Sequence, residues 1–178
     1  MILLMGVAGA GKSMQGRMLA DSKGYAWIST GEILRVLVTG KRRQEMLAGN
    51  LLSDAEMIRM MDKVLDLINL QDEFILDGFP RTLKQADWLI DQVQMGRFKV
   101  SAVIHLTASE EVVLSRLQQR GRLDDTEEAI RNRFDEYRAV TLPIVQDFKD
   151  KGITVFDVDA SKTPEEVQAQ ITNHVIDV

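Results

Sequence analysis

The chain has 178 residues, 45% of them hydrophobic, and a formal net charge of −5. This length indicates one domain with room for a small insertion, and the hydrophobic content excludes a disordered chain. The absence of cysteine excludes disulfides and thiolate zinc sites, and the negative charge argues against a nucleic-acid binder that works by bulk attraction.

The first residues, MILLMG, lack the basic region and the cleavage site of a signal peptide. No apolar run is long enough to span a membrane. We therefore expect a cytoplasmic protein that has neither a membrane nor a nucleic acid as its partner.

Five apolar runs are typical of strands buried on both faces of a parallel sheet, because they are apolar almost throughout rather than alternating. They occupy residues 1–6, 25–29, 73–78, 100–108 and 152–158. Helical patterns lie between them. This alternation predicts an α/β fold: a doubly wound, five-stranded parallel sheet with helices on both faces.

Three helices have recognisable patterns. Residues 53–69 carry one apolar stripe, and Ser53 with Glu56 forms a capping box at its start. A helix over 163–176 has Thr163 as its cap, and residues 124–149 place Ile130, Phe134, Tyr137 and Thr141 on one face. The segment 30–72 holds more helix than one crossover needs, which predicts a small helical subdomain that projects from the sheet.

A glycine-rich loop follows the first apolar run. Residues 6–13, GVAGAGKS, fit the pattern G-x-x-x-x-G-K-[ST]. Small residues let backbone N–H groups surround a phosphate, Lys12 can reach the terminal phosphates, and the Ser13 hydroxyl can meet Mg²⁺. The sequence therefore predicts a phosphate-binding loop, which GTPases, ATPases, kinases and transporter subunits share.

Two later motifs suggest a reaction. Asp77 ends an apolar strand, where it can organise Mg²⁺ together with Ser13. Arg35 and Arg81 each follow a strand at the same edge of the sheet, where they could clamp a second phosphate. Alternatively, each arginine forms a surface ion pair, and Gly-Phe-Pro-Arg at 78–81 is only a rigid turn.

Several segments together resemble the adenylate kinase family, in order and spacing, over essentially the whole chain. They are GVAGAGKSMQ, STGEILR, GNLLSD, DGFPRTLKQA, GRLDDTEEAIRNRFDEY and VDASKTPEEV. The family transfers the terminal phosphate of ATP to AMP, reversibly and with Mg²⁺. The resemblance implies Mg²⁺ with ATP, and no zinc, and makes ATP, AMP and ADP the partners.

The resemblance also implies roles for particular residues. Arginines around the transferring phosphoryl group, with Lys12, carry catalysis; they are Arg81, Arg120, Arg122 and Arg133. The ATP site comprises Gly9, Ala10, Gly11, Lys12, Ser13, Met14, Arg116 and Lys162. The AMP site comprises Thr30, Arg35, Asn50, Leu52, Gly78, Arg81, Gln85, Arg122 and Arg133, with the Gln85 amide reading the adenine edge. Ser13 and Asp77 would hold Mg²⁺, in part through waters.

The chain departs from the family in several places, among them the phosphate loop and the lid. Ala8 and Met14 stand in the phosphate loop where Pro and Thr are usual. A single residue, Gly121, separates Arg120 from Arg122, where relatives insert a lid or a loop. We therefore expect a core of residues 1–29 and 61–178, an NMP-binding subdomain at 30–60, and a lid reduced to a turn at 120–124.

Three functions remain open from the sequence. We expect an adenylate kinase; the alternatives are a UMP/CMP or broad-specificity nucleoside-monophosphate kinase, and a non-catalytic nucleotide-binding module. Thr30 and Thr82 favour AMP, because UMP/CMP kinases usually have Ala and Asn there. We expect a monomer, with a homo-oligomer whose neighbouring chain covers the site as the alternative.

Overall fold

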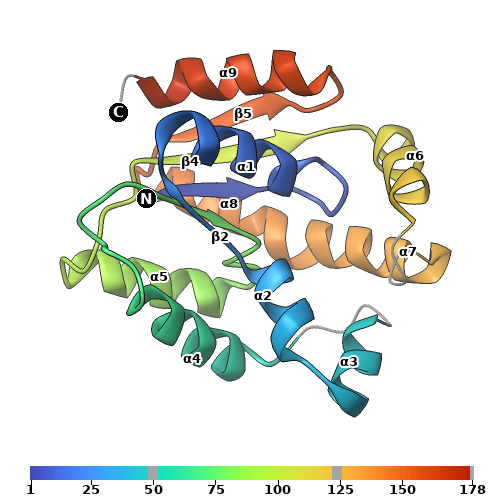
Figure 1. Ribbon diagram of the computed structural model, residues 1–178, viewed down its shortest axis with the longest axis horizontal. Coiled ribbons are helices and arrows are strands. Elements are labelled where there is room, and N and C mark those ends of the chain that lie inside the picture. The colour runs from blue at the N-terminus through green and yellow to red at the C-terminus, as the bar shows by residue number, and fades with distance from the viewer. Residues whose placement is uncertain (48–51, 122–125, 177–178) are drawn as a thin grey trace.

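A computed structural model describes residues 1–47, 52–121 and 126–176. Its centre is a five-stranded sheet in the order β2-β3-β1-β4-β5 (Figure 1). The strands are β1 (Ile2–Met5), β2 (Ala26–Ser29), β3 (Phe74–Asp77), β4 (Ala102–Thr107) and β5 (Val155–Asp159), and every neighbouring pair is parallel. The predicted doubly wound sheet is confirmed: β1 to β4 lie within their predicted runs, and β5 extends one residue beyond its run.

Helices cover both faces of the sheet because β1 is apolar on both sides. Ile2 and Leu4 face one core cluster, and Leu3 and Met5 face the other. The first cluster is closed by α1 (Lys12–Lys23), α6 (Glu110–Arg120), α7 (Glu127–Glu136) and α9 (Pro164–Ile176), and the second by α4 (Asp54–Leu65), α5 (Leu83–Gln94) and α8 (Leu142–Asp150).

The predicted helix caps are present. Ser53 and Glu56 form both hydrogen bonds of the capping box of α4, and Thr163 exchanges hydrogen bonds with Glu166 at the start of α9. The α4 helix ends at Leu65, earlier than the predicted 69, and Met57, Met61 and Leu65 are its buried stripe.

The predicted helix over 124–149 differs from the structure in one respect. It consists of α7, a π-helical turn (Tyr137–Thr141) and α8 in succession. A π turn inserts one residue into the helical repeat, so side chains beyond it are rotated relative to a regular α-helix. The turn places the Thr141 hydroxyl 3.1 Å from the carbonyl oxygen of Arg81, to which it donates.

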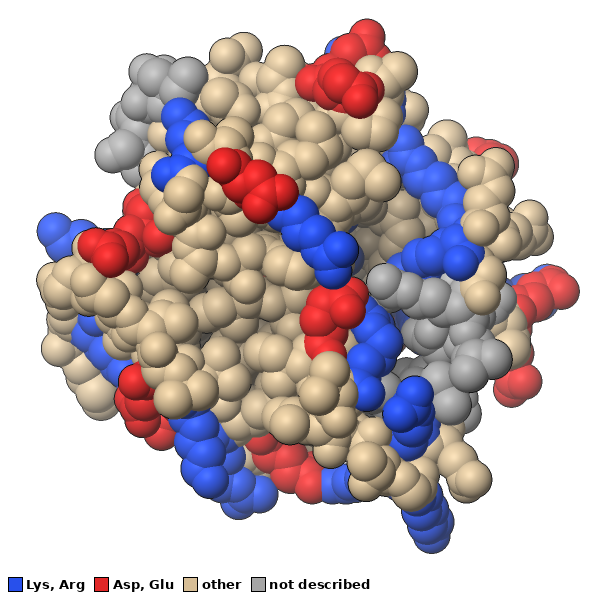
Figure 2. All heavy atoms as spheres, viewed as in Figure 1, with Lys and Arg blue, Asp and Glu red and all other residues tan. Residues whose placement is uncertain are grey.

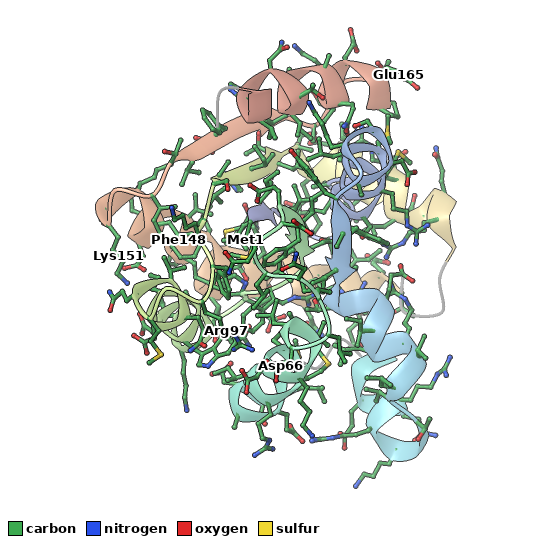
Figure 3. The ribbon with its side chains drawn as sticks, turned by 60° about the vertical axis from the view of Figure 1, so that its left-hand side comes forward. Met1, Asp66, Arg97, Phe148, Lys151 and Glu165 are labelled. Atoms are coloured by element: carbon green, nitrogen blue, oxygen red, sulfur yellow. The ribbon has the colours of Figure 1, made fainter. Side chains whose placement is uncertain are left out.

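Two short helices, α2 (Thr30–Leu37) and α3 (Gly40–Leu47), lie between β2 and α4 and project beside the sheet (Figure 1). Arg97, after α5, anchors α4 by donating to Asp62 and Asp66 (Figure 3). In the described residues, no helix has the length and apolar character that a membrane crossing requires.

Candidate functional site

A cavity of about 1100 Å³ opens at the carboxyl edge of the sheet. The loops after β1, β3 and β5 line it, together with α2, the end of α6, one side of α7 and the π turn. Figure 2 shows a hollow in this face of the molecule, bordered by several Lys and Arg side chains. In doubly wound folds, ligands bind at this edge, next to the point where the strand order reverses.

The glycine-rich loop forms one wall of the cavity. Gly6 has φ +137°, and a Cβ there would lie 2.4 Å from the carbonyl oxygen of Leu106, so a side chain cannot fit. Gly11 also has a positive φ and precedes α1, whose first turn receives no hydrogen bond from a capping side chain. The N-terminal end of α1 is therefore able to bind an anion through its backbone N–H groups.

Lys12 begins α1 and bends back over the loop. Its Nζ donates to the carbonyl oxygens of Gly6 at 2.7 Å and Val7 at 2.9 Å. The pKa of Lys12 is lowered to about 8, chiefly because burial disfavours the charged ammonium group; Asp77 opposes this effect, and the charges of Arg81 and Arg120 add to it. Without a ligand, this ammonium group donates to backbone oxygens and is offset by Asp77, and a phosphate could replace the backbone oxygens.

Ser13 and Asp77 meet across the floor of the cavity. The Ser13 hydroxyl donates to Asp77 Oδ2 at 2.7 Å, and Asp77 is buried. These are oxygen ligands of the kind that Mg²⁺ takes, usually one or two from the protein with the rest from waters and phosphates. The described residues contain no cluster of three or more His, Asp or Glu that could hold a metal alone. The pair therefore fits a metal that arrives with a phosphate.

Arg81 follows the end of β3 by four residues and lines the same cavity as the glycine loop. Its Nε donates to the carbonyl oxygen of Gly78 at 2.9 Å. The pKa of this guanidinium is lowered, and burial is the largest cause. The charges of Arg133 and Arg35 lower it as well, whereas Asp77 and Glu136 oppose the change. Several cations thus share one small volume with two carboxylates, an arrangement suited to a ligand of high negative charge.

Two predicted acceptor-site residues have partners within the protein. Arg35 lines the cavity and donates to Glu32 Oε1 at 2.6 Å. Thr30 is buried beneath the cavity surface, and its hydroxyl donates to the carbonyl oxygen of Asp77 at 3.2 Å. A Cβ on Gly78 would lie 2.6 Å from that hydroxyl, which explains the glycine at this position.

Gln85 is buried in the first turn of α5 and lines the cavity, which Leu52 also borders. Its Oε1 accepts from the backbone N–H of Arg81 at 2.9 Å, and its Nε2 donates to Asp54 Oδ1 at 2.8 Å. The amide is therefore held on two sides.

The predicted donor-site residues line the other end of the cavity. Arg116 donates to the carbonyl oxygens of Ala160 at 2.7 Å and Lys162 at 3.3 Å, which fixes the loop between β5 and α9. Arg120 and Arg133 also line the cavity, as do the predicted loop residues Gly9, Ala10, Gly11, Lys12, Ser13 and Met14. Asn50 and Arg122 lie outside the described residues.

The comparisons with known proteins agree with this geometry. The family model described as adenylate kinase matches residues 4–153. The chain belongs to the adenylate kinase family. It is similar to proteins named adenylate kinase from Mycobacterium sp. (37% identical, 95% of each chain covered), Parasynechococcus marenigrum (36%, 96% of each) and Corynebacterium urealyticum (35%, 93% of each). Membership makes it a phosphotransferase with a nucleotide-binding fold, as predicted.

Among the cavity residues of this adenylate kinase family member that were not predicted as site residues are Glu136, Tyr137 and Thr141. Burial raises the pKa of Glu136, while Arg81 and Arg133 oppose that effect. Tyr137 bonds through its hydroxyl to Nε2 of the buried His105 at 2.5 Å. The apolar periodicity places these residues near the buried face but does not indicate a cavity there.

Proposed function

We propose that this chain catalyses the reversible transfer of the terminal phosphoryl group of ATP to AMP, giving two ADP. The observation that carries the proposal is the convergence of Lys12, Arg81, Arg120 and Arg133 on one cavity between the glycine loop and Gln85. ATP would extend from the glycine loop toward Arg116 and Lys162, and AMP from Arg81 toward Gln85 and Leu52. The phosphates of both nucleotides would then meet at the cations.

Phosphoryl transfer passes through a loose transition state whose charge is spread over the phosphoryl oxygens. Cations held in place before reaction stabilise that charge without reorganisation. Lys12 would exchange its carbonyl partners for phosphate oxygens, and Arg81 is already fixed by Gly78. No covalent intermediate is required, because AMP supplies the attacking oxygen.

Mg²⁺ would be held by Ser13 and Asp77, in part through waters, together with the phosphates of ATP. When bound, it supplies positive charge that neutralises the phosphates and orients them. Asp77 also offsets the charges of Lys12 and Arg81 before the nucleotide binds. Thr30 supports the same segment from below, so we propose it as an AMP-site residue that acts through Asp77 and Gly78.

The proposed division of the chain has a core of 1–29 and 61–178, an NMP-binding subdomain of 30–60, and a lid reduced to residues 120–124. Supporting it, α2 and α3 project beside the sheet, and α6 ends at Arg120 while α7 begins at Glu127. Arg120 is thus the last residue of α6, and six residues of chain separate it from α7. AMP binding would close the site mainly through movement of residues 30–60.

The function is tested by a coupled assay with MgATP and each of AMP, CMP, UMP and GMP. Efficient turnover with AMP alone supports the proposal. Equal or better turnover with CMP or UMP identifies a UMP/CMP or broad-specificity kinase. Nucleotide binding without turnover on any acceptor identifies a non-catalytic module.

The short connection between α6 and α7 leads to a prediction about the donor. Lys162 and Gln119, which border the donor end of the cavity, are exposed, so few of the residues that the structure describes can enclose the donor base. We expect GTP to replace ATP with a loss of kcat/KM of no more than about tenfold, and ATP hydrolysis without AMP to be a measurable fraction of turnover. Kinetics at several protein concentrations, with light scattering, check this. A monomer that is strictly ATP-specific would contradict it.

The pKa of Lys12 gives a second prediction. Phosphates favour the charged ammonium, so ATP binding raises this pKa above its value of about 8 in the free protein. Above about pH 8, the complex then holds more protons than the free protein, so binding takes up protons and weakens as the pH rises. Calorimetry at about pH 8.5 in buffers of different ionisation enthalpy measures the uptake. The Lys12→Met variant should show none, and Lys23→Met, at the other end of α1, should behave as the wild type.

A further inference from the structure

The Gln85 amide is held in one orientation by two groups of opposite hydrogen-bonding character. Its Oε1 accepts from the backbone N–H of Arg81, and its Nε2 donates to the Asp54 carboxylate. A backbone N–H can only donate, and an ionised carboxylate can only accept. If the amide were flipped, its N–H would face the N–H of Arg81 and its oxygen would face the Asp54 carboxylate, and neither hydrogen bond could form. The two partners therefore fix the orientation of the amide.

Asp54 is itself held in place. It is the first residue of α4, and its Oδ1 also accepts from the Thr82 hydroxyl at 2.8 Å. Thr82 caps α5 by accepting from the backbone N–H of Gln85. The N-terminal ends of α4 and α5 are therefore joined by one carboxylate oxygen, which receives hydrogen bonds from both Thr82 and Gln85.

The fixed polarity determines what the amide can offer to a base. A primary amide has two N–H donors and two acceptor lone pairs. With one of each used by Asp54 and Arg81, an N–H and a lone pair are left for the cavity. Adenine matches them, because its N1 accepts and its 6-amino group donates. A 6-oxopurine has N1–H and O6, which is the opposite pattern at nearly the same size.

We propose that Asp54 is a positioning residue for the acceptor base. It holds the Gln85 amide in the orientation that binds 6-aminopurine nucleoside monophosphates and rejects 6-oxopurine ones. This inference rests on the proposed function, because it assumes that Gln85 contacts the base of the acceptor. Without the Asp54 carboxylate, only the Arg81 N–H restrains the amide. The amide can then flip, exchanging its oxygen and nitrogen, into the orientation that a 6-oxopurine requires.

The test compares AMP with IMP as acceptors, because IMP changes the hydrogen-bonding pattern with little change of shape. We expect Asp54→Ala to lower the AMP:IMP ratio of kcat/KM by about tenfold, roughly the effect of one lost hydrogen bond in a buried polar site. Asp54→Asn retains an oxygen acceptor and should keep most of the ratio. The KM for ATP should not change in either variant. If Asp54→Asn lowers the ratio as much as Asp54→Ala does, the acceptor role is contradicted.

Two controls separate positioning from a general loss of structure. Asp62→Ala removes a carboxylate from the same helix, one that pairs with Arg97 instead, and should leave the ratio unchanged. In a Gln85→Leu background, Asp54→Ala should have no further effect on the ratio, because Asp54 acts through the amide. If Asp54→Ala acted through a general loss of structure, it would lower turnover with AMP and IMP equally. It would also lower turnover in the Gln85→Leu background.

The failure of the inference can be distinguished from that of the proposed function. If the wild type phosphorylates AMP and Asp54→Ala keeps the wild-type ratio, the positioning role is overturned while the function stands. If the wild type does not phosphorylate AMP, the function fails, and calorimetric binding of AMP and IMP decides the inference. The same AMP:IMP ratio of affinities in the wild type and in Asp54→Ala would then overturn the inference.

Discussion

Arg81→Ala is expected to lower kcat/KM roughly 30- to 1000-fold. This corresponds to a loss of about 2–4 kcal/mol of transition-state stabilisation. The guanidinium lies beside Asp77, Glu136 and Arg133 in the cavity, held by its own hydrogen bond to Gly78. The loss should fall on kcat as well as on the KM for AMP, because the charge on the phosphoryl oxygens is stabilised most in the transition state.

The structure indicates that this substitution removes the guanidinium and little else. The backbone N–H of Arg81 donates to Gln85, and its carbonyl oxygen accepts from Thr141, so the alanine variant retains both contacts. Thermal unfolding should change little, because the loss of a partner for Asp77 and Glu136 is balanced by relief of the repulsion from Arg133 and Arg35. A fall in melting temperature that accounts for the lost activity would show that Arg81 acts on folding instead.

The matched control is Arg131→Ala. Arg131 is 73% exposed on α7 and pairs with Glu127 at 2.8 Å, away from the cavity lining. Surface substitutions of this kind usually change the free energy of unfolding by no more than about 0.5 kcal/mol. Similar losses of kcat/KM in the two variants would show that the arginines are wrongly sorted into cavity and surface groups.

The strands and the glycine loop could be predicted because their patterns are local. A buried parallel strand is apolar along its whole length, and a phosphate loop needs small residues at fixed spacing. The predicted strand runs contain β1 to β4 and all but the last residue of β5, and the capping residues of α4 and α9 stand where the sequence places them. Each of these signals lies within a few consecutive residues.

The π turn and the role of Asp54 could not be predicted, because each depends on contacts between distant segments. Asp54 lies 31 residues before Gln85, and only the packing of α4 against α5 brings them together. The π turn places Thr141 against the Arg81 carbonyl, 60 residues away, and its sequence resembles an ordinary helix. Likewise, the sequence identifies Gln85 but not the two hydrogen bonds that already hold its amide.

Asp77→Asn is expected to have the other large effect, because Asp77 offsets two cations at once. Removal of its charge leaves Lys12 and Arg81 with less compensation in a buried site, where loss of one partner costs about 3–5 kcal/mol in the free energy of unfolding. The amide cannot supply the anionic oxygen to which Ser13 now donates. We expect kcat/KM with MgATP and AMP to fall about 100-fold or more.

The metal dependence of ATP binding separates the two roles of Asp77. If Asp77 holds Mg²⁺, the Asn variant should bind MgATP more weakly than the wild type does. It should bind metal-free ATP, measured by calorimetry in EDTA, as tightly or more tightly, because a negative charge has left the phosphate site. Asp72→Asn is the control, since Asp72 is exposed just before β3 and bonds to Asn69. Equal weakening of both forms of ATP would mean that Asp77 organises the cations and takes no part in holding the metal.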